Sequence, residues 1–455
     1  MKAERAGFEA RLGLLDATAL VAGSMIGSGI FIVSADIVRR LPAPGWLLSV
    51  WAIAGVLTVA GALSYGRLAA AMPRAGGQYV YLAELYGPLW GFLYGWTLVL
   101  VIQTGTIAAV AVAFATYAGQ LWPALSPEHR LASLGPVVLT PVRLTAVATI
   151  LLLTALNGRG LDVGRSVQNV FTVAKVGVLL TVVVLGLVFA DPAARAASLS
   201  RPAFATGLSP VATVLELGAA MVGALFSADA WANVTFTAAE VRDPRRTVPR
   251  ALLLGTTLVC LLYLLTNVAY LNVLSLDAIQ HAPADRVGTA TMERITGGTR
   301  GAALMALAVM VSTFGCANGL ILAGARVAWA MARDGRFFAR AATLNANHVP
   351  GAALWMQGGW AAVLALSGRY GDLLDYVIIA ELLFYLLTVG GLLVLARRNG
   401  ESPRGAGFPW LQWGYLVTVG ALVLVLLVAK PAYTWGSLAV VASGLPAYLL
   451  TRRRA

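Results

Sequence analysis

The sequence predicts an all-α membrane protein whose chain crosses the bilayer twelve times. Three observations support this fold class: 59% of the 455 residues are hydrophobic, only 12% are charged, and the apolar residues fall in long runs. Soluble globular proteins have a much more polar composition. A helix needs about 20 apolar residues to cross the hydrocarbon core of a membrane. The runs in this chain have about that length.

The expected spans follow one another with short polar segments between them. Only the five-residue segment GRYGD separates the ninth and tenth spans. The spans are expected at about 14–39, 46–71, 88–122, 141–157, 164–190, 210–237, 250–274, 300–332, 352–368, 373–396, 410–430 and 433–451.

The basic residues predict the orientation of the chain in the membrane. Most of the 33 lysines and arginines lie in segments on the same side as the N-terminus when the spans alternate. Cytoplasmic loops carry the excess of lysine and arginine. Both tails, 1–13 and 452–455, are therefore expected on the cytoplasmic side of a plasma membrane or a bacterial inner membrane. The net charge of +13 is divided among loops rather than gathered on one face, so we expect no nucleic-acid partner.

Several classes of protein are excluded by what the chain lacks. Both cysteines, Cys260 and Cys316, fall within spans, and the three histidines are far apart in the sequence. There is no P-loop and no HExxH helix, and the longest polar loop, 275–299, is too short for a catalytic domain. These features argue against an ATP-driven pump and a metalloprotease. We expect no enzyme activity, no catalytic residue, no metal site and no cofactor.

The segment GSMIGSGIF, residues 23–31, places weak helix formers inside the first span. Gly23 and Gly27 on their own would indicate close helix packing. The run Gly27-Ser28-Gly29 favours an interruption of the helix instead, and irregular backbone at membrane depth is tolerated where it lines a cavity. The amides that begin the second half-helix would then form a receptor for a carboxylate.

Five segments together resemble the amino-acid permeases of the amino acid–polyamine–organocation superfamily. They are GSMIGSGIF, MPRAGGQYVYLAELYGPLWGFLYGW (72–96), VQNVFTVAK (167–175), AEVRDPRRTVPRAL (239–252) and GARVAWAMARDGRFF (324–338). The chain is most similar to bacterial relatives of the L-type, sodium-independent exchangers. The resemblance implies a leucine-transporter-like fold with two inverted repeats of five spans, at 14–190 and 210–396, followed by two extra spans at 410–451.

The resemblance also implies a second interrupted helix, in span 6, at LFSADAWAN (225–233). The alanine-rich composition alone does not predict this break. Phe226 matches the aromatic gate over the substrate, while Ala228 and Ala230 depart from the ring and the glycine usual in related exchangers. The implied substrate-contacting residues are Met25, Ile26, Gly27, Ser28, Gly29, Ile30, Gln103, Phe226, Ser227, Asp229 and Gly319.

Lys175 lies in the middle of span 5, where a charged group is costly and therefore points to a function. A structural lysine paired with a carboxylate is the alternative. In sodium-independent relatives, the resemblance implies, this ammonium takes the place of a sodium ion and joins span 5 to the break in span 1. Hydroxyls on span 8 would complete the arrangement, and Ser312 and Thr313 are the candidates.

Three further residues have two interpretations each. Glu381 on span 10 and Glu216 on span 6 are candidate proton sites or paired structural carboxylates. Gln103 on span 3 either faces the substrate or makes a hydrogen bond between helices.

The predicted function is sodium-independent transport of amino acids by alternating access, either by exchange or with a proton. An amino-acid sensor is the alternative class, although it would fit better with a long cytoplasmic domain. Small residues near Phe226 favour a neutral substrate, whereas Asp229 leaves a cationic one open. Residues 123–140 contain no cysteine, so no disulfide-linked heavy subunit is expected. The sequence makes no prediction about the oligomeric state.

Overall fold

The structure is a computed structural model that describes residues 8–126, 129–134, 137–367, 370–400 and 409–452. Helices account for nearly all of the described elements, and nine of these helices are long and apolar enough to cross a membrane. The prediction of an all-α membrane protein is therefore confirmed. A hairpin of two three-residue strands, β1 (Ala132–Leu134) and β2 (Val137–Leu139), is the sheet found in the described part of the chain.

Nine expected spans contain a helix long and apolar enough to cross a membrane, and in the sixth of the twelve this helix ends at Ser227, before the expected end of the span. These are α3 (Pro44–Ala71), the run Pro88–Leu121 formed by α5, η2 and α6, α7 (Pro141–Gly158), α8 (Leu161–Val188), α10 (Pro210–Ser227), α12 (Pro244–Val273), α15 (Thr299–Arg333), α17 (Tyr370–Arg398) and α18 (Pro409–Ala429). The other expected spans are the interrupted first one, the shorter α16 (Gly351–Ser367) and α19 (Pro431–Arg452). Helix α16 ends at Ser367 and α17 begins at Tyr370, so residues 370–372 of the segment GRYGD belong to α17, and its first two residues lie outside the described ranges. The expected tails lie partly outside the described residues, which begin at residue 8 and end at residue 452.

Short elements connect these spans. They include α4 (Gln78–Tyr86), η3 (Pro123–Leu125), α9 (Pro192–Leu199), η4 (Ala238–Glu240), α13 (Leu276–Gln280), η5 (Pro283–Asp285), α14 (Val287–Thr296) and η6 (Ala339–Ala342). Within the third span, the five residues of η2 (Leu98–Ile102) form a π-helix between α5 (Pro88–Thr97) and α6 (Gln103–Leu121). Such a bulge locally changes the direction in which side chains leave the helix.

The first span is interrupted where the glycines predict it. Helix α1 (Leu14–Met25) ends at Ile26, whose backbone is extended with φ −75° and ψ 96°. After Gly27 and Ser28 the chain forms one turn of 3-10 helix, η1 (Gly29–Phe31), and continues as α2 (Val33–Arg40). The first amides of this second half therefore lack the acceptors that a continuous helix would give them.

The sixth span is interrupted as well. Helix α10 ends at Ser227, and the chain becomes helical again only at α11 (Asn233–Phe236). Between them Ala230 has φ +67°, in the left-handed region that alanine rarely occupies. Alanine favours helix, so the composition here hides the break.

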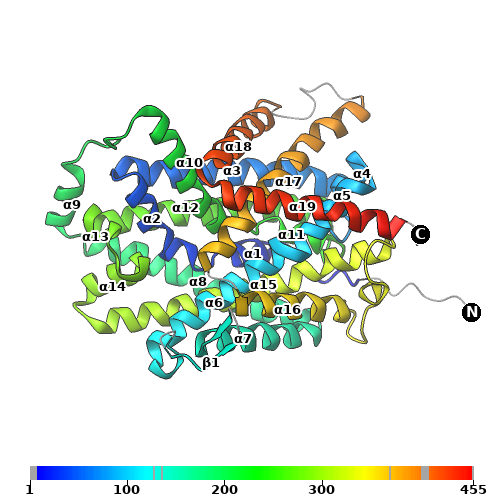
Figure 1. The fold of residues 1–455 in the computed structure, drawn as a ribbon, viewed down its shortest axis with the longest axis horizontal. Coiled ribbons are helices and arrows are strands. Elements are labelled where there is room, and N and C mark those ends of the chain that lie inside the picture. Colours follow the sequence, from blue (N-terminus) through cyan, green and yellow to red (C-terminus); the bar gives the residue numbers. More distant parts are fainter. Residues whose placement is uncertain (1–7, 127–128, 135–136, 368–369, 401–408, 453–455) are drawn as a thin grey trace, which may run out of the picture.

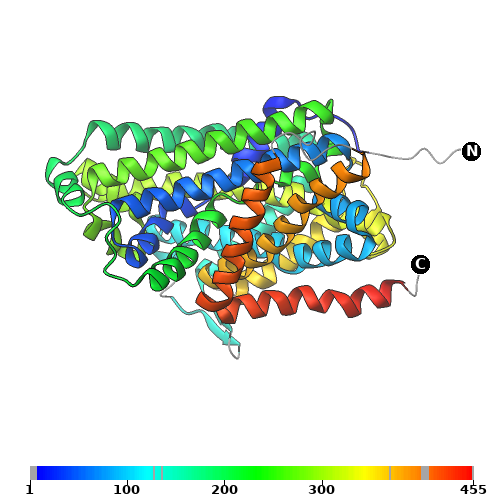
Figure 2. The ribbon, with the colours of Figure 1, turned by 90° about the horizontal axis from the view of Figure 1, so that it is seen from above.

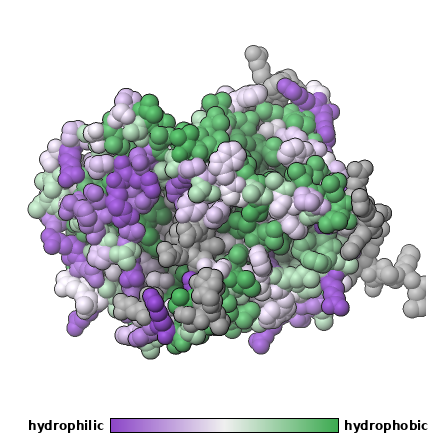
Figure 3. Space-filling model, viewed as in Figure 1, coloured by the Kyte–Doolittle hydropathy of each residue, from purple (hydrophilic) through white to green (hydrophobic). Residues whose placement is uncertain are grey.

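Both described ends of the chain lie at the same end of the molecule (Figures 1 and 2), as an even number of crossings requires. Helix α1 lies near the centre, where it packs against α8, α12 and α15. Helix α2 leads away from the centre toward α13 and the end opposite the termini. In Figure 3, hydrophilic residues gather at that opposite end, and much of the remaining visible face is hydrophobic.

Candidate functional site

The two interrupted spans touch at their breaks. A Cβ atom added to Gly29 would lie 2.0 Å from Oγ of Ser227 and 3.2 Å from its Cα. Both residues are buried, with Ser227 only 3% exposed. The structure thus brings the expected segment Met25–Ile30 against the end of α10. Backbone groups of two broken helices meet there in the interior of the molecule.

Lys175 joins α8 to the break in the first span. Its Nζ donates hydrogen bonds to the carbonyl oxygens of Gly23, at 2.6 Å, and Ile26, at 2.9 Å. The side chain is completely buried, and no carboxylate forms an ion pair with it among the described residues. The ammonium therefore binds main-chain carbonyls that have lost the amide donors of a continuous helix. A bound cation could contact the same carbonyls.

Helix α15 supplies two more donors to the same break. Ser312 Oγ lies 3.1 Å from the carbonyl oxygen of Ile26 and 3.0 Å from that of Gly27. Cys316 Sγ contacts the carbonyl oxygen of Ser24 at 2.9 Å. The hydroxyl of Thr313, expected beside Lys175, instead donates within its own helix to Val309. Adjacent residues on a helix point about 100° apart, so one hydroxyl faces the break and its neighbour does not.

Tyr263 on α12 was missed by the sequence analysis. Its hydroxyl is 3.0 Å from the carbonyl oxygen of Met25 and 3.0 Å from that of Ser227, so it connects the two breaks directly. Met25 and Ser227 are both among the residues that the resemblance implies contact the substrate. A tyrosine in an apolar run gives no sequence signal for such a contact, because its partners lie 238 and 36 residues away.

Phe226 and Asp229 flank the end of α10 in different surroundings. Phe226 is the penultimate residue of the helix and is 8% exposed. The carboxylate of Asp229 is turned toward α17, where Oδ1 accepts a hydrogen bond of 2.5 Å from the hydroxyl of Tyr385. The ring of Trp231 stacks on that of Tyr385 with centroids 5.2 Å apart. The Asp229 side chain therefore belongs to a cluster between spans 6 and 10.

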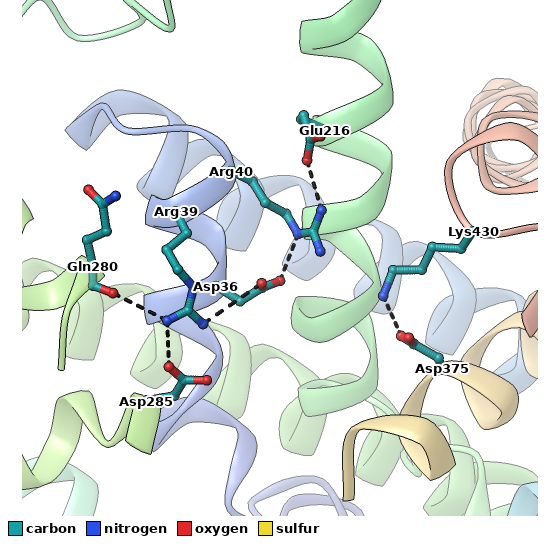
Figure 4. Close-up of polar contacts among 8 residues, drawn as sticks. All are labelled: Asp36, Arg39, Arg40, Glu216, Gln280, Asp285, Asp375 and Lys430. Atoms are coloured by element: carbon teal, nitrogen blue, oxygen red, sulfur yellow. Dashed lines mark hydrogen bonds and ion pairs between the residues drawn. The ribbon is translucent and has the colours of Figure 1, made fainter. Parts of the chain in front are cut away.

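The two glutamates that the sequence singled out have opposite surroundings. Glu381 on α17 is 4% exposed, and its Oε2 has no hydrogen-bond partner among the described residues. Glu216 on α10 is 39% exposed and lies 2.8 Å from Nη1 of Arg40 (Figure 4). Glu216 is thus a paired carboxylate near the surface, whereas Glu381 is buried away from any ion pair that the structure describes.

Gln103 and Gly319 both lie at contacts with span 8. Nε2 of Gln103 donates to the carbonyl oxygen of Leu320 at 2.8 Å, the hydrogen bond between helices that was one of its two interpretations. Gly319 packs closely against α1, because a Cβ at this position would be 2.6 Å from Oγ of Ser24. Both residues therefore fix the position of α15 beside the first break.

Ion pairs close the end of the molecule opposite the termini. Arg40 contacts Asp36 at 2.9 Å as well as Glu216, so it ties α2 to α10 (Figure 4). Arg39 contacts Asp285 at 2.6 Å and the carbonyl oxygen of Gln280, so it ties α2 to the loop before α14. These side chains are between 28% and 43% exposed. The second half of the first span, α2, is thus held by ion pairs at a partly exposed surface.

The end that carries the termini is closed by a buried ion pair. Arg326 on α15 faces Glu240 in η4 with N–O distances of 2.9 and 3.0 Å, and both side chains are at most 2% exposed. The carbonyl oxygen of Glu240 also accepts hydrogen bonds from the amides of Arg11 and Leu12. The segment before α1 is therefore linked through η4 to α15.

Comparisons with known proteins agree with this architecture. Residues 12–447 match the model of a family described as amino acid permease. The chain is 30% identical over 447 residues to the human large neutral amino acids transporter small subunit 2, covering 96% of this chain and 80% of the relative.

Two other relatives show a comparable similarity. The mouse b(0,+)-type amino acid transporter 1 is 29% identical over 93% of this chain and 84% of its own length. The human Asc-type amino acid transporter 1 is 29% identical over 98% of this chain and 83% of its own length. The family match and the relatives both extend over nearly the whole chain, including the two breaks. The chain therefore belongs to the amino acid permease family.

Proposed function

We propose that this protein transports amino acids by alternating access, without sodium and in exchange for a second amino acid. The observation that carries the proposal is the meeting of two broken helices at Gly29 and Ser227. Each break exposes backbone groups in the membrane interior, where they need a partner. A zwitterionic ligand matches such a site, because it presents an anion and a cation a few ångströms apart.

In this proposal the backbone recognises the part of the substrate that all amino acids share. The α-carboxylate binds the amides around Ser28 and Gly29, next to the positive end of the half-helix that follows. The α-ammonium binds carbonyls of Met25, Phe226, Ser227 and Asp229. Phe226 covers the bound molecule as a gate. In the present structure the hydroxyl of Tyr263 is hydrogen-bonded to two of these carbonyls. In the proposal the ammonium replaces the hydroxyl at these carbonyls when the substrate binds.

The sodium-independent part of the proposal is supported by Lys175. The Nζ atom lies between the carbonyl oxygens of Gly23 and Ile26, and Ser312 completes this group on the other side. A permanently attached cation there would make a sodium ion unnecessary. The arrangement keeps the unwound segment in place whether or not an ion is present in the medium.

We further propose the topology that is usual for such a carrier. Residues 14–190 and 210–396 form the two inverted repeats, each beginning with an interrupted span, and residues 410–451 are appended. The termini face the cytoplasm, because the excess of basic residues lies on that side.

The chain acts without a disulfide-linked partner, although one relative is named a small subunit. Residues 123–140 offer no cysteine for such a bond.

We propose a neutral amino acid as the substrate. The side-chain end of the site has small residues at Ala228 and Ala230, and the Asp229 carboxylate is engaged by Tyr385. The relatives' names cover large neutral amino acids as well as other classes, so they favour an amino acid without fixing its charge. A sensor without transport is the less favoured class.

The experiment is uptake of a panel of radiolabelled amino acids into proteoliposomes that contain the purified chain. Uptake is measured with and without internal amino acid, and with sodium or choline outside. Stimulation by internal amino acid and equal rates in sodium and choline are the expected results. Binding without uptake of any amino acid in the panel would refute transport, and stimulation by sodium would refute the role of Lys175.

Proton-linked uptake is a second candidate mode. It is favoured by one specific observation, the presence of two buried carboxylates, Asp229 and Glu381, beside the break in the sixth span.

A further inference from the structure

Helices α3 and α12 run side by side (Figure 2), and a cavity of about 360 Å³ opens along the seam between them. Its walls are mainly apolar and include Val56 and Leu63 from α3 and Leu261 and Leu264 from α12. Val56 is 66% exposed and Leu261 55% exposed, so the cavity is open on the outer surface of the helix bundle. Because both helices are long and apolar enough to cross a membrane, this opening faces lipid.

Arginines continue the walls of this groove at one of its ends. On α3, Arg67 follows Leu63 by four residues, and on α12, Arg250 precedes Leu261 by eleven residues. Residues at these spacings lie on one face of a helix. Each helix therefore presents apolar side chains to the groove and then, on the same face, an exposed arginine.

The two arginines belong to a larger group at one level of the molecule. Helices α3 and α12 touch beside them, because a Cβ atom added to Gly66 would lie 3.2 Å from Cα of Pro249. The start of α12 and the residues just before it add further exposed arginines. The arginine cluster consists of Arg67, Arg242, Arg245, Arg246 and Arg250. The amide of Arg242 donates to the carbonyl oxygen of Leu12, so the cluster lies at the end of the molecule that carries the termini.

The positive charge of the arginine cluster is almost uncompensated. Among the described residues, the acid that pairs with it is Asp243, which lies 3.9 Å from Arg246 with both side chains more than 60% exposed. Such an exposed pair contributes little binding energy. Guanidinium groups match the geometry of phosphate oxygens, and basic groups beside membrane helices attract anionic lipid headgroups.

The length of the groove matches one lipid chain. From Arg67 to Val56 the helix rises about 16 Å, since each of the eleven residues adds about 1.5 Å. The hydrocarbon core of a bilayer is about 30 Å thick, so one leaflet fills about half of it. We propose that the seam between α3 and α12 binds an anionic phospholipid, with its phosphate on the arginine cluster and one acyl chain in the groove.

The far end of the groove reaches the link between the two breaks. Trp51 lines the cavity there, and its ring packs edge-on against that of Tyr263 with centroids 5.4 Å apart. The hydroxyl of Tyr263 is hydrogen-bonded to the carbonyl oxygens of Met25 and Ser227. A chain that fills the cavity therefore packs against the residue that supports this link.

The test uses the purified full chain in a nonionic detergent and a phosphatidylglycerol that carries a photoreactive diazirine in one acyl chain. After irradiation, mass spectrometry of peptides locates the lipid. Adducts are expected on residues 51–63 and 257–264. Unlabelled phosphatidylglycerol should remove them, whereas phosphatidylcholine with the same acyl chains should not. No amino acid is present, so the result does not depend on the proposed transport function.

Variants separate the headgroup site from the groove. Arg67→Gln combined with Arg250→Gln is expected to lower the affinity for phosphatidylglycerol about tenfold or more. Val59→Phe, which fills the groove, should reduce the adducts although the arginine cluster is intact. The matched control is Arg195→Gln combined with Arg201→Gln. It removes two exposed arginines near the opposite ends of α12 and α3 and should leave the affinity unchanged.

A second measurement shows whether the variants remain folded. The melting temperature without lipid should be the same in the unmodified protein and in the arginine variants. Added phosphatidylglycerol should raise it in the unmodified protein and in the control, and not in Arg67→Gln with Arg250→Gln. Adducts elsewhere on the chain, equal competition by phosphatidylcholine, or full affinity in that double variant would overturn the proposal. Unchanged adducts in Val59→Phe would overturn the groove as the place of the acyl chain.

Discussion

Gly29 lies directly against Ser227, so that the backbone of one broken helix packs on the serine side chain that ends the other. This contact is possible only for glycine, because a Cβ atom at residue 29 would overlap the Ser227 hydroxyl.

Gly29→Ala is expected to abolish substrate binding, because the added methyl group separates the two breaks. Gly359→Ala in α16 is the control, since a Cβ there would meet no atom within 4 Å. Equilibrium binding of labelled amino acid measures both variants. Decarboxylated amines should compete poorly for the unmodified protein because they lack the proposed carboxylate anchor. Equal affinities in the two variants would argue against the contact as part of the site.

Lys175→Met is expected to reduce transport at least tenfold, because it removes two hydrogen bonds from a charged donor, each worth roughly 1.5–3 kcal/mol. Ser312→Ala should cause a smaller loss, as it removes a neutral donor from the same carbonyls. Thr313→Val is the control, because its hydroxyl bonds within its own helix. Initial rates of uptake rank the three variants. A loss in Thr313→Val as large as in Lys175→Met would contradict this assignment.

Tyr263→Phe is expected to lower the melting temperature in the absence of substrate, since the carbonyls of Met25 and Ser227 lose their shared donor. The effect corresponds to about 1 kcal/mol for one neutral hydrogen bond. Saturating amino acid should reduce the difference, because its ammonium would take over the same carbonyls. Tyr270→Phe, whose hydroxyl is 3.3 Å from the carbonyl oxygen of Ile30, serves for comparison. A difference unaffected by substrate would assign Tyr263 a purely structural role.

Ala230→Gly is expected to stabilise the protein by about 1 kcal/mol, because alanine at φ +67° carries strain that glycine does not. Ala232→Gly is the control: this residue has φ −65°, so glycine there should be neutral or destabilising. Thermal unfolding in detergent compares the two substitutions. A lower melting temperature for Ala230→Gly than for the unmodified protein would show that the left-handed conformation is not a source of strain.

The long apolar runs and the glycines at 27 and 29 were sufficient to predict the membrane helices and the first break. Hydrophobic length and weak helix formers act locally, so one chain segment contains the whole signal. The second break was predicted through the resemblance alone. Its alanines favour a helix locally, and the packing around Ala230 overrides that preference.

Contacts between distant spans were harder to predict. The hydroxyl of Tyr263, the pairing of Arg326 with Glu240 and the hydrogen bond from Tyr385 to Asp229 all join residues far apart in the sequence. No periodicity within one span indicates such a partner. The prediction that the Thr313 hydroxyl lies beside Lys175 was wrong, because this hydroxyl forms its hydrogen bond within its own helix. The adjacent position on the helix faces the break instead.

The two ends of the molecule are closed by ion pairs of different kinds. Arg39 and Arg40 form theirs at a partly exposed surface, whereas Arg326 and Glu240 meet in the interior. Dissolved salt screens exposed charges far more than buried ones, because the Debye length falls to about 3 Å at 1 M. High ionic strength should therefore loosen the end around Arg40 while leaving the Arg326 end shut. Of the two sets of ion pairs, the one around Arg40 is thus the one that dissolved salt weakens.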